Sequence, residues 1–238
     1  MKLLKPNDVV FDVFAGIGPF AVPAAKKNAC VYANDLNPHS YEFLVKNTVL
    51  NKCKQESVKC YNQDGREFIQ TVIKQELEKL YSSWDEKTKV NVCVIMNLPA
   101  LAYTFLDAFH GLLSESAVTI PEAAPKPQVY CYCFTDNEAA QASCGGDMEL
   151  EVKQRAAGVL RGLVAEEVTV RQVRNVAPKK DMMCLSFALT RDILQPAASR
   201  DEGDGNLGCI DVLKPLTLVC FQNMKRSFII ANIYSIHI

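Results

Sequence analysis

The sequence predicts an α/β protein with a mostly parallel, doubly wound, Rossmann-like sheet of seven strands and an antiparallel C-terminal hairpin. Apolar runs of strand length alternate with helix-period segments over residues 9 to 161, which is typical of βαβ units. A glycine turn follows the first apolar run, where an open α/β sheet binds its ligand. The last two apolar runs flank a Pro-Lys-Lys turn instead of a helix, which predicts an antiparallel pair at the sheet edge.

Each expected strand is a short run rich in Val, Tyr, Phe and Cys, while each expected helix is a longer segment with polar residues at helical spacing. The five runs that predict parallel strands are 9–14, 30–35, 57–62, 91–97 and 129–134. The segments that predict helices are 17–27, 38–50, 65–81, 100–114 and 136–161, and the hairpin falls within 164–189.

The composition changes near residue 191. The stretch "RDILQPAASRDEGDGNLG" is rich in Asp, Gly, Pro and Ser and is typical of a linker. The apolar windows that follow have no matching helix or partner strand. We therefore expect one domain over residues 1–190 and, over 191–238, a linker and a tail that does not pack, with an added edge strand as the alternative for the tail.

Charge and cysteine content exclude several classes of protein. The formal net charge is −1 for 238 residues, so contact with RNA would require a local basic patch. The 10 cysteines lie mostly in apolar runs, which favours reduced, buried thiols, and the three histidines have no metal-ligand spacing, so we expect no metal site. We also expect no membrane span, because the longest apolar run is shorter than the ~20 residues that a bilayer requires.

The glycine turn is compatible with two classes of cofactor. Residues 16–21, "GIGPFA", fit the loose pattern G-x-G-x-x-G/A, in which Gly16 and Gly18 let a ligand approach the backbone closely. A nicotinamide dinucleotide would gain nothing from the acid Asp12 on the preceding strand, whereas a cationic sulfonium would. We therefore expect S-adenosyl-L-methionine, with Asp12, Phe14 and both glycines at its site.

Two further acids follow the second and third strands. Asp35 can accept hydrogen bonds from ribose hydroxyls, and Asp64 can accept one from an adenine amine, with Gly65 allowing a close approach. Each acid could instead be the N-cap of the following helix, although Asn37 can cap the helix after Asp35. Three acids at successive strand ends favour nucleoside binding.

The fourth strand ends in Asn97-Leu98-Pro99. The Asn97 amide offers a donor and an acceptor to the edge of a nucleobase, and Pro99 stiffens the turn. We therefore predict Asn97 and Pro99 as catalytic-site residues, with Asn97 also near the cofactor. The alternative is a plain turn in which Pro99 begins a helix.

Several stretches together resemble the catalytic domain of the archaeal and eukaryotic tRNA (guanine-37-N1)-methyltransferases, over roughly residues 5–190. They are "DVFAGIGPFAVPAA", "YANDLNPHSYEFLVKNTVLN", "DGREF", "VIMNLPALAYTFLDAF" and "VRNVAPKKDM". The resemblance implies a class I S-adenosylmethionine-dependent methyltransferase that methylates N1 of the tRNA guanosine 3′ of the anticodon. It further implies that Asp35, Leu36, Asp64 and Gly65 contact the cofactor and that Asn97 lies between cofactor and guanine.

The resemblance also implies features outside this pattern. Family members carry a general base and an O6 donor upstream of the first strand, and we expect both to be missing here, which would weaken activity.

A local excess of Lys and Arg over residues 151–180 suits tRNA phosphates or a solvated surface. We expect a monomer in the cytoplasm, nucleus or mitochondrial matrix. The alternatives are an NAD-dependent oxidoreductase and a non-catalytic S-adenosylmethionine-binding fragment.

Overall fold

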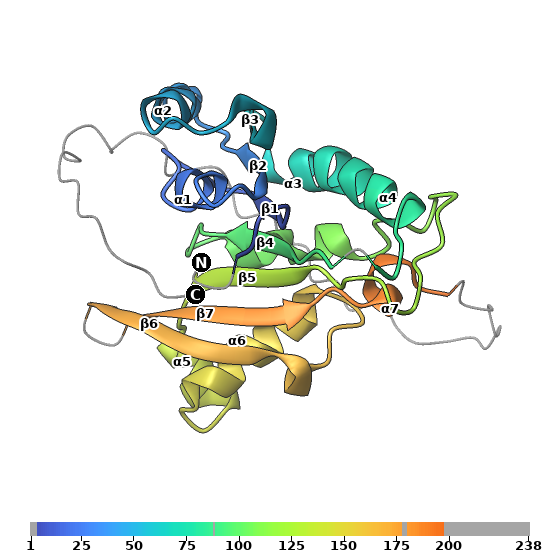
Figure 1. Ribbon diagram of the computed structural model, residues 1–238. Coiled ribbons are helices and arrows are strands. Elements are labelled where there is room, and N and C mark those ends of the chain that lie inside the picture. Colours follow the sequence, from blue (N-terminus) through green and yellow to red (C-terminus); the bar gives the residue numbers. More distant parts are fainter. Residues whose placement is uncertain (1–3, 88, 178–179, 198–238) are drawn as a thin grey trace. The chain divides into compact units, whose positions relative to one another are not determined.

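The computed structural model describes residues 4–87, 89–177 and 180–197. Seven strands form one sheet in the order β3-β2-β1-β4-β5-β7-β6, in which β7 runs antiparallel to both β5 and β6 and the other pairs are parallel (Figure 1). This confirms the predicted fold. The strands are β1 (Val9–Asp12), β2 (Cys30–Asn34), β3 (Val58–Tyr61), β4 (Val92–Met96), β5 (Gln128–Phe134), β6 (Thr169–Ala177) and β7 (Lys180–Ala188).

Helices cover both faces of the sheet. α1 (Ala21–Ala25) and α2 (Pro38–Leu50) lie against the β1–β3 part of one face, and α3 (Gly65–Phe68) and α4 (Lys74–Ser82) lie on the other side of it (Figure 1). A π-helical turn, Ile69–Ile73, joins α3 to α4. The 3-10 segment η3 (Ala102–Phe109) contacts both α3 and α6 (Met148–Val159). α5 (Asn137–Ser143) precedes α6, and short 3-10 turns lie at Gln55–Ser57 and Ala165–Glu167.

The burial of the strands follows from their position in the sheet. The central strand β4 is buried along most of its length, as a strand covered on both faces must be, and its sequence is continuously apolar. β6 lies at the edge, is mostly exposed and carries Arg171 and Arg174. Charged residues on an edge strand discourage pairing with another chain.

The first expected helix, 17–27, is wrong at its start, since α1 begins only at Ala21. Gly16 and Gly18 have φ of +56° and +98°, which an α-helix does not allow. Residues 16–20 therefore form a loop between β1 and α1.

The expected helices 100–114 and 136–161 also differ from the structure. The first is a run of 3-10 turns in η3 rather than an α-helix. The second is divided into α5 and α6, because Gly145 and Gly146 both have positive φ and Asp147 caps the new helix through the amides of Glu149 and Leu150.

The expected linker does not begin at residue 191. α7 (Arg191–Leu194) buries Ile193 and Leu194, whose carbonyls accept hydrogen bonds from the amides of Gly111 and Leu113. The compact unit therefore extends to Ala197. The predicted tail, from residue 198 onward, lies outside the described residues and stays a prediction.

Candidate functional site

The sequence-predicted site residues lie at the carboxyl ends of four neighbouring strands. Asp12 is paired with Ala33 on β2 and with Ile95 on β4. The residues that follow each of these three by two positions are therefore neighbours at the end of the sheet. Those residues are Phe14, Asp35 and Asn97. Open parallel sheets bind ligands at this edge, which we call the carboxyl rim.

The glycine loop after β1 is attached to the end of β2. The Gly16 amide donates to Asp35 Oδ2 at 2.8 Å, and the Asn37 amide donates to Asp35 Oδ1 at 2.9 Å. Asp35 is therefore not a helix N-cap, since Asn37 caps α2 through the His39 amide. A carboxylate has lone pairs for about four hydrogen bonds, so Asp35 retains capacity for ribose hydroxyls.

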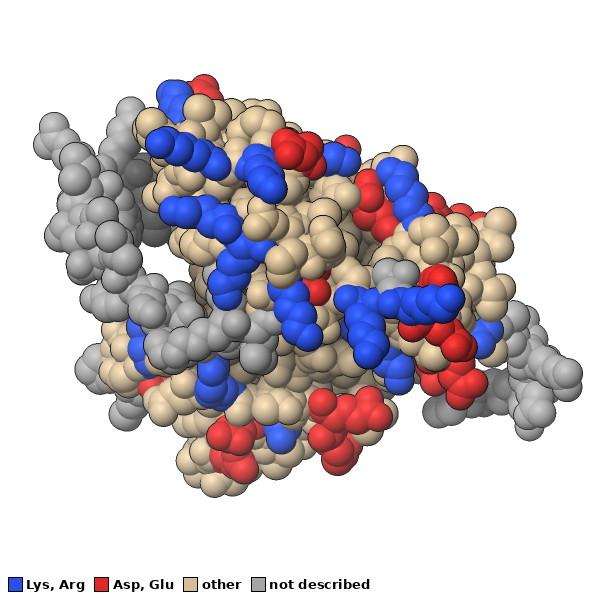
Figure 2. All heavy atoms as spheres, in the orientation of Figure 1, with Lys and Arg blue, Asp and Glu red and all other residues tan. Residues whose placement is uncertain are grey.

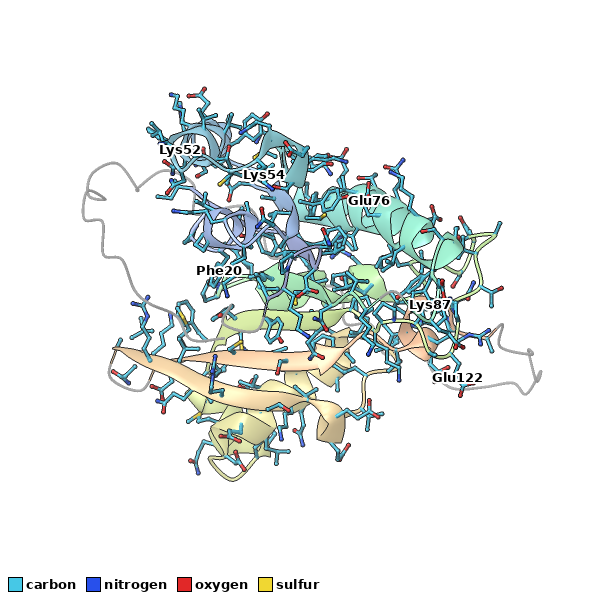
Figure 3. The ribbon with its side chains drawn as sticks, in the orientation of Figure 1. Phe20, Lys52, Lys54, Glu76, Lys87 and Glu122 are labelled. Atoms are coloured by element: carbon cyan, nitrogen blue, oxygen red, sulfur yellow. The ribbon has the colours of Figure 1, made fainter. Side chains whose placement is uncertain are left out.

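Gly18 allows the loop to lie directly on α2. A Cβ at this position would lie 2.9 Å from Leu44 Cδ1 and 2.9 Å from Val22 Cγ2, and its φ of +98° also disfavours other residues. Phe20, labelled in Figure 3, ends the loop and packs against the Tyr132 ring at 5.8 Å between centroids. The loop is thus held on two sides by packing.

Asp12 is a completely buried acid beside this loop. Among the described residues, neither of its carboxylate oxygens has a partner in hydrogen-bonding geometry. Burial raises the pKa of Asp12 to about 8, the charge of Asp35 adds to the rise, and the backbone amide of Ala21 opposes it. An acid buried without a partner is costly, which marks Asp12 as a candidate functional residue beside the glycine loop.

Phe14 and Gly65 form a tightly packed wall of the site. A Cβ on Gly65 would lie 2.7 Å from Phe14 Cε1, so only glycine fits without a shift. Phe14 also makes an edge contact with the Phe105 ring, with centroids 5.1 Å apart. Asp64 is the N-cap of α3, where it accepts a hydrogen bond from the Arg66 amide at 2.8 Å. The capping alternative therefore holds for Asp64, whose exposed second oxygen remains available.

Two asparagines that were not predicted tie the rim loops together. Asn34 is buried, donates to the carbonyls of Val13 and Gln63, and accepts from the Gln63 amide. Asn62 donates to the carbonyls of Asp35 and Leu36. The signal for Asn34 was present, since it is a polar residue at the end of a buried strand. Leu36 itself is 64% exposed at the rim.

The Asn97-Leu98-Pro99 turn follows β4. The Asn97 side chain has no hydrogen-bond partner in the described parts of the chain, whereas the turn's backbone is well bonded. The Leu98 carbonyl accepts from the amides of Leu101 and Ala102, and the Pro99 carbonyl accepts from the Phe134 amide at 3.0 Å. The turn is thus held in place by its backbone and leaves the Asn97 amide free.

An open cleft of about 1190 Å³ borders Pro99, and its lining includes none of Asp12, Asp35 and Asp64. It lies between the turn after β4, the end of β5, α5, α6 and the start of β7. Sequence reasoning missed it, although "FTD" at the end of the fifth strand is the same kind of signal as the acids after the second and third. Its lining residues are Pro99, Ala100, Tyr103, Phe134, Thr135, Asp136, Glu138, Gln141, Ala142, Met148, Arg155 and Lys180.

Two further features bear on the kind of site. Within residues 4–87, 89–177 and 180–197, no three His, Cys, Asp or Glu side chains come together in a way that could hold a metal ion. None of the helices in the same ranges combines the length and apolarity needed to cross a bilayer.

Comparisons with known proteins found similar sequences and structures. A family model described as the TRM5/TYW2 methyltransferase domain matches residues 1–121. The tRNA (guanine(37)-N(1))-methyltransferase of Xenopus tropicalis is 47% identical over 191 residues, which are 80% of this chain and 36% of that protein. The Homo sapiens protein of the same name is 44% identical over 200 residues, which are 84% of this chain and 37% of that protein.

This chain spans less than half the length of these relatives. A crystal structure of Trm5b from Pyrococcus abyssi is also similar, with 26% identity and a TM-score of 0.49. The match covers 79% of this chain and 46% of that one.

Proposed function

The chain belongs to the family of the TRM5/TYW2 methyltransferase domain, and from this membership we propose that it transfers a methyl group from S-adenosyl-L-methionine to N1 of guanosine 37 in tRNA. One observation carries the proposal beyond family membership. Asn97, whose side chain is unpartnered among the described residues, follows β4 level with Phe14 and Asp35 at the carboxyl rim and comes two residues before Pro99, which lines the cleft. A transferase needs this order of cofactor site, recognition group and acceptor site.

The rim residues fit the proposed cofactor. Asp12 is a buried acid without a partner among the described residues, and Asp35 retains accepting capacity beside the glycine loop. When bound, S-adenosyl-L-methionine supplies a methyl group activated by its sulfonium charge. The chain's own contribution is to hold the nucleoside through Asp35 and Asp64, while Asp12 lies completely buried beneath the glycine loop.

Asn97 supplies both a donor and an acceptor to the guanine edge. Pro99 limits the turn's freedom, so that the base is held in line with the methyl group. N1 of guanine carries a proton that must leave, which requires a general base. The family resemblance assigns that base to a segment before the first strand, so we assign it to none of the residues discussed here.

Basic side chains near the cleft suit the phosphates of tRNA. Lys180 lines the cleft, with Nζ 4.3 Å from the centroid of the Phe134 ring, and Arg171 and Arg174 are exposed on β6. Lys179, also part of the predicted basic stretch, lies outside the described residues. Arg155 belongs to the same stretch, but its guanidinium is bound internally.

A second basic area lies on the α1, α2 and β3 part of the face shown in Figure 2, while acidic side chains gather toward its lower margin, near α5 and α6. Lys52 and Lys54, labelled in Figure 3, lie at the α2 end of this area. Both of these lysines are exposed. Although the net charge is −1, the basic and acidic side chains lie on different parts of this face. The basic part would favour contact with an RNA backbone.

The two alternatives are not favoured. Membership of a methyltransferase family speaks against a nicotinamide-dependent oxidoreductase. A non-catalytic fragment would give no reason for an unpartnered Asn97 beside an open cleft. The monomeric state and the cellular compartment stay predictions.

The direct test is transfer of labelled methyl groups from S-adenosyl-L-methionine to transcribed tRNA. We expect N1-methylguanosine at position 37, and none with a tRNA that carries adenosine there. Methylation of both tRNAs at equal rates would contradict the assigned position. Because the general base is assigned to a segment before the first strand, the decisive measurement uses the chain with that segment of its relatives joined to it, and failure of this protein to methylate either tRNA would overturn the proposed activity.

A further inference from the structure

Arg155 connects three elements around the cleft. Its Nη2 donates to the Phe134 carbonyl at the end of β5 at 2.7 Å. Its Nε lies 3.2 Å from Glu151 Oε1, one turn earlier on α6. Its guanidinium carbon lies 4.6 Å from the centroid of the Tyr103 ring in η3. The planar guanidinium therefore uses its edge and its face at the same time.

The partner of Arg155 is itself buried. The Glu151 side chain is 5% exposed, and burial raises its pKa, while the neighbouring Arg155 guanidinium opposes the rise. Removing one member of such a pair leaves the other buried without compensation. Glu151 thus restricts the Arg155 side chain to one orientation.

The contacts continue to the turn after β4. Phe134, whose carbonyl accepts from Arg155, donates its amide to the Pro99 carbonyl at 3.0 Å. Tyr103, whose ring lies against the same guanidinium, follows the turn in the chain. Arg155 therefore holds the segment from Asn97 to Tyr103 at two places.

We infer that Arg155, oriented by Glu151, is a positioning residue that holds the Asn97-Leu98-Pro99 turn at the border between the carboxyl rim and the cleft. This inference rests on the proposed function, because it assigns Arg155 a role in methyl transfer through Asn97. Arg155 differs from Arg171 and Arg174, which are exposed on β6, since its donors bind a carbonyl and a carboxylate of the protein.

The experiment combines kinetics with a double-mutant cycle. We expect Arg155→Ala to lower kcat for tRNA methylation by about 10- to 100-fold, because a small displacement of a positioned group has a large effect on rate. The KM for tRNA and the Kd for S-adenosylhomocysteine should change by less than about threefold. Arg155→Lys should recover only part of the rate, since an ammonium lacks the planar fork.

The cycle with Asn97→Ala separates positioning from general stability. If Arg155 acts through the turn, Arg155→Ala should lower the rate of the Asn97→Ala variant by less than about threefold. Independent, multiplicative effects would overturn the inference, and so would a change confined to the KM for tRNA. Glu151→Gln, which keeps the side-chain shape, should show the same pattern in a milder form.

Arg191→Ala is the matched control, because Arg191 is an exposed arginine on α7, beyond the opposite end of β7 from the cleft. Hydrogen exchange supplies a readout that needs no activity. In Arg155→Ala, the Phe134 amide should exchange faster, while the Val94 amide in β4 should not. Unchanged exchange at Phe134 would overturn the inference even if the wild-type chain methylates tRNA, and faster exchange without methylation would overturn only the proposed function.

Discussion

The backbone amide of Gly16 donates a hydrogen bond to Asp35 at 2.8 Å, and this contact joins the glycine loop after β1 to the end of β2. The other carboxylate oxygen of Asp35 accepts from the Asn37 amide at 2.9 Å. One side chain therefore shapes the loop and the start of α2 while it faces the carboxyl rim. Loop geometry and ligand binding should respond together when Asp35 is changed.

Asp35→Asn should destabilise the protein and weaken S-adenosylhomocysteine binding. An amide has only one accepting oxygen, so one of the two charge-assisted backbone bonds is lost, at a cost of about 1.5 to 3 kcal/mol in the free energy of unfolding. Urea denaturation measures this change. Asp85→Asn is the control, since Asp85 also accepts from a backbone amide but in an exposed loop before β4. Equal losses of stability and of S-adenosylhomocysteine binding in the two variants would contradict a specific role of Asp35 at the carboxyl rim.

Gly65→Ala should lower the stability of the protein, whereas Gly158→Ala should raise it. The new Cβ at position 65 would lie 2.7 Å from Phe14, and the displacement should cost about 1 to 3 kcal/mol and weaken nucleoside binding. The same change at Gly158 meets nothing within 4 Å inside α6, so it should stabilise the protein by up to about 1 kcal/mol. Thermal melts of both variants check the prediction. An unchanged melting temperature in Gly65→Ala would contradict the prediction and show that Phe14 can move away from the new methyl group.

Asp12 should make the stability of the ligand-free protein fall with pH. Its pKa is about 8 in the folded protein and near 3.8 in the unfolded chain, so the folded state binds one more proton between these values. The free energy of unfolding should therefore decrease as the pH rises through this interval, by at most about 1.4 kcal/mol per pH unit. Denaturation of the wild type and Asp12→Asn across this range tests it. If the free energy of unfolding depends on pH in the same way in both proteins, the raised pKa of Asp12 is contradicted.

Asn97→Ala should remove activity without loss of stability. The side chain has no hydrogen-bond partner among the described residues, so the free energy of unfolding should change by less than about 0.5 kcal/mol. Methyl transfer should fall by about 100-fold or more, because the amide would no longer hold the base edge. Asn51→Ala is the contrasting control, because it removes a side-chain hydrogen bond to the Asn47 carbonyl at the end of α2 and should lower stability without lowering methyl transfer. A strong loss of stability in Asn97→Ala would assign this residue a structural role.

The strands and the rim acids could be predicted from the sequence because their signals are local. The second, third and fourth predicted runs end in Asp35, Asn62 and Asn97, and parallel strands bring those ends to one edge. The break between α5 and α6 also has a local signal, the Gly-Gly-Asp at 145–147, which the apolar pattern on both sides outweighed. α7 was missed because a four-residue helix derives its stability from burial of Ile193 and Leu194, not from its own sequence.

The cleft could not be predicted, because its walls come from distant parts of the chain. Pro99, Phe134, Arg155 and Lys180 meet only after β7 inserts between β5 and β6. The role of Arg155 was hidden for the same reason. A sequence shows a basic stretch, whereas only the structure shows that one of its arginines binds a carbonyl, a carboxylate and a ring.

Isothermal titration of the purified chain with S-adenosylhomocysteine, and separately with NADH, tests the cofactor assignment most directly. We expect saturable, one-to-one binding of S-adenosylhomocysteine that is weakened in Asp35→Asn, and no binding of NADH under the same conditions. Saturable binding of NADH with no binding of S-adenosylhomocysteine would contradict the assignment of the carboxyl rim to a methyl donor.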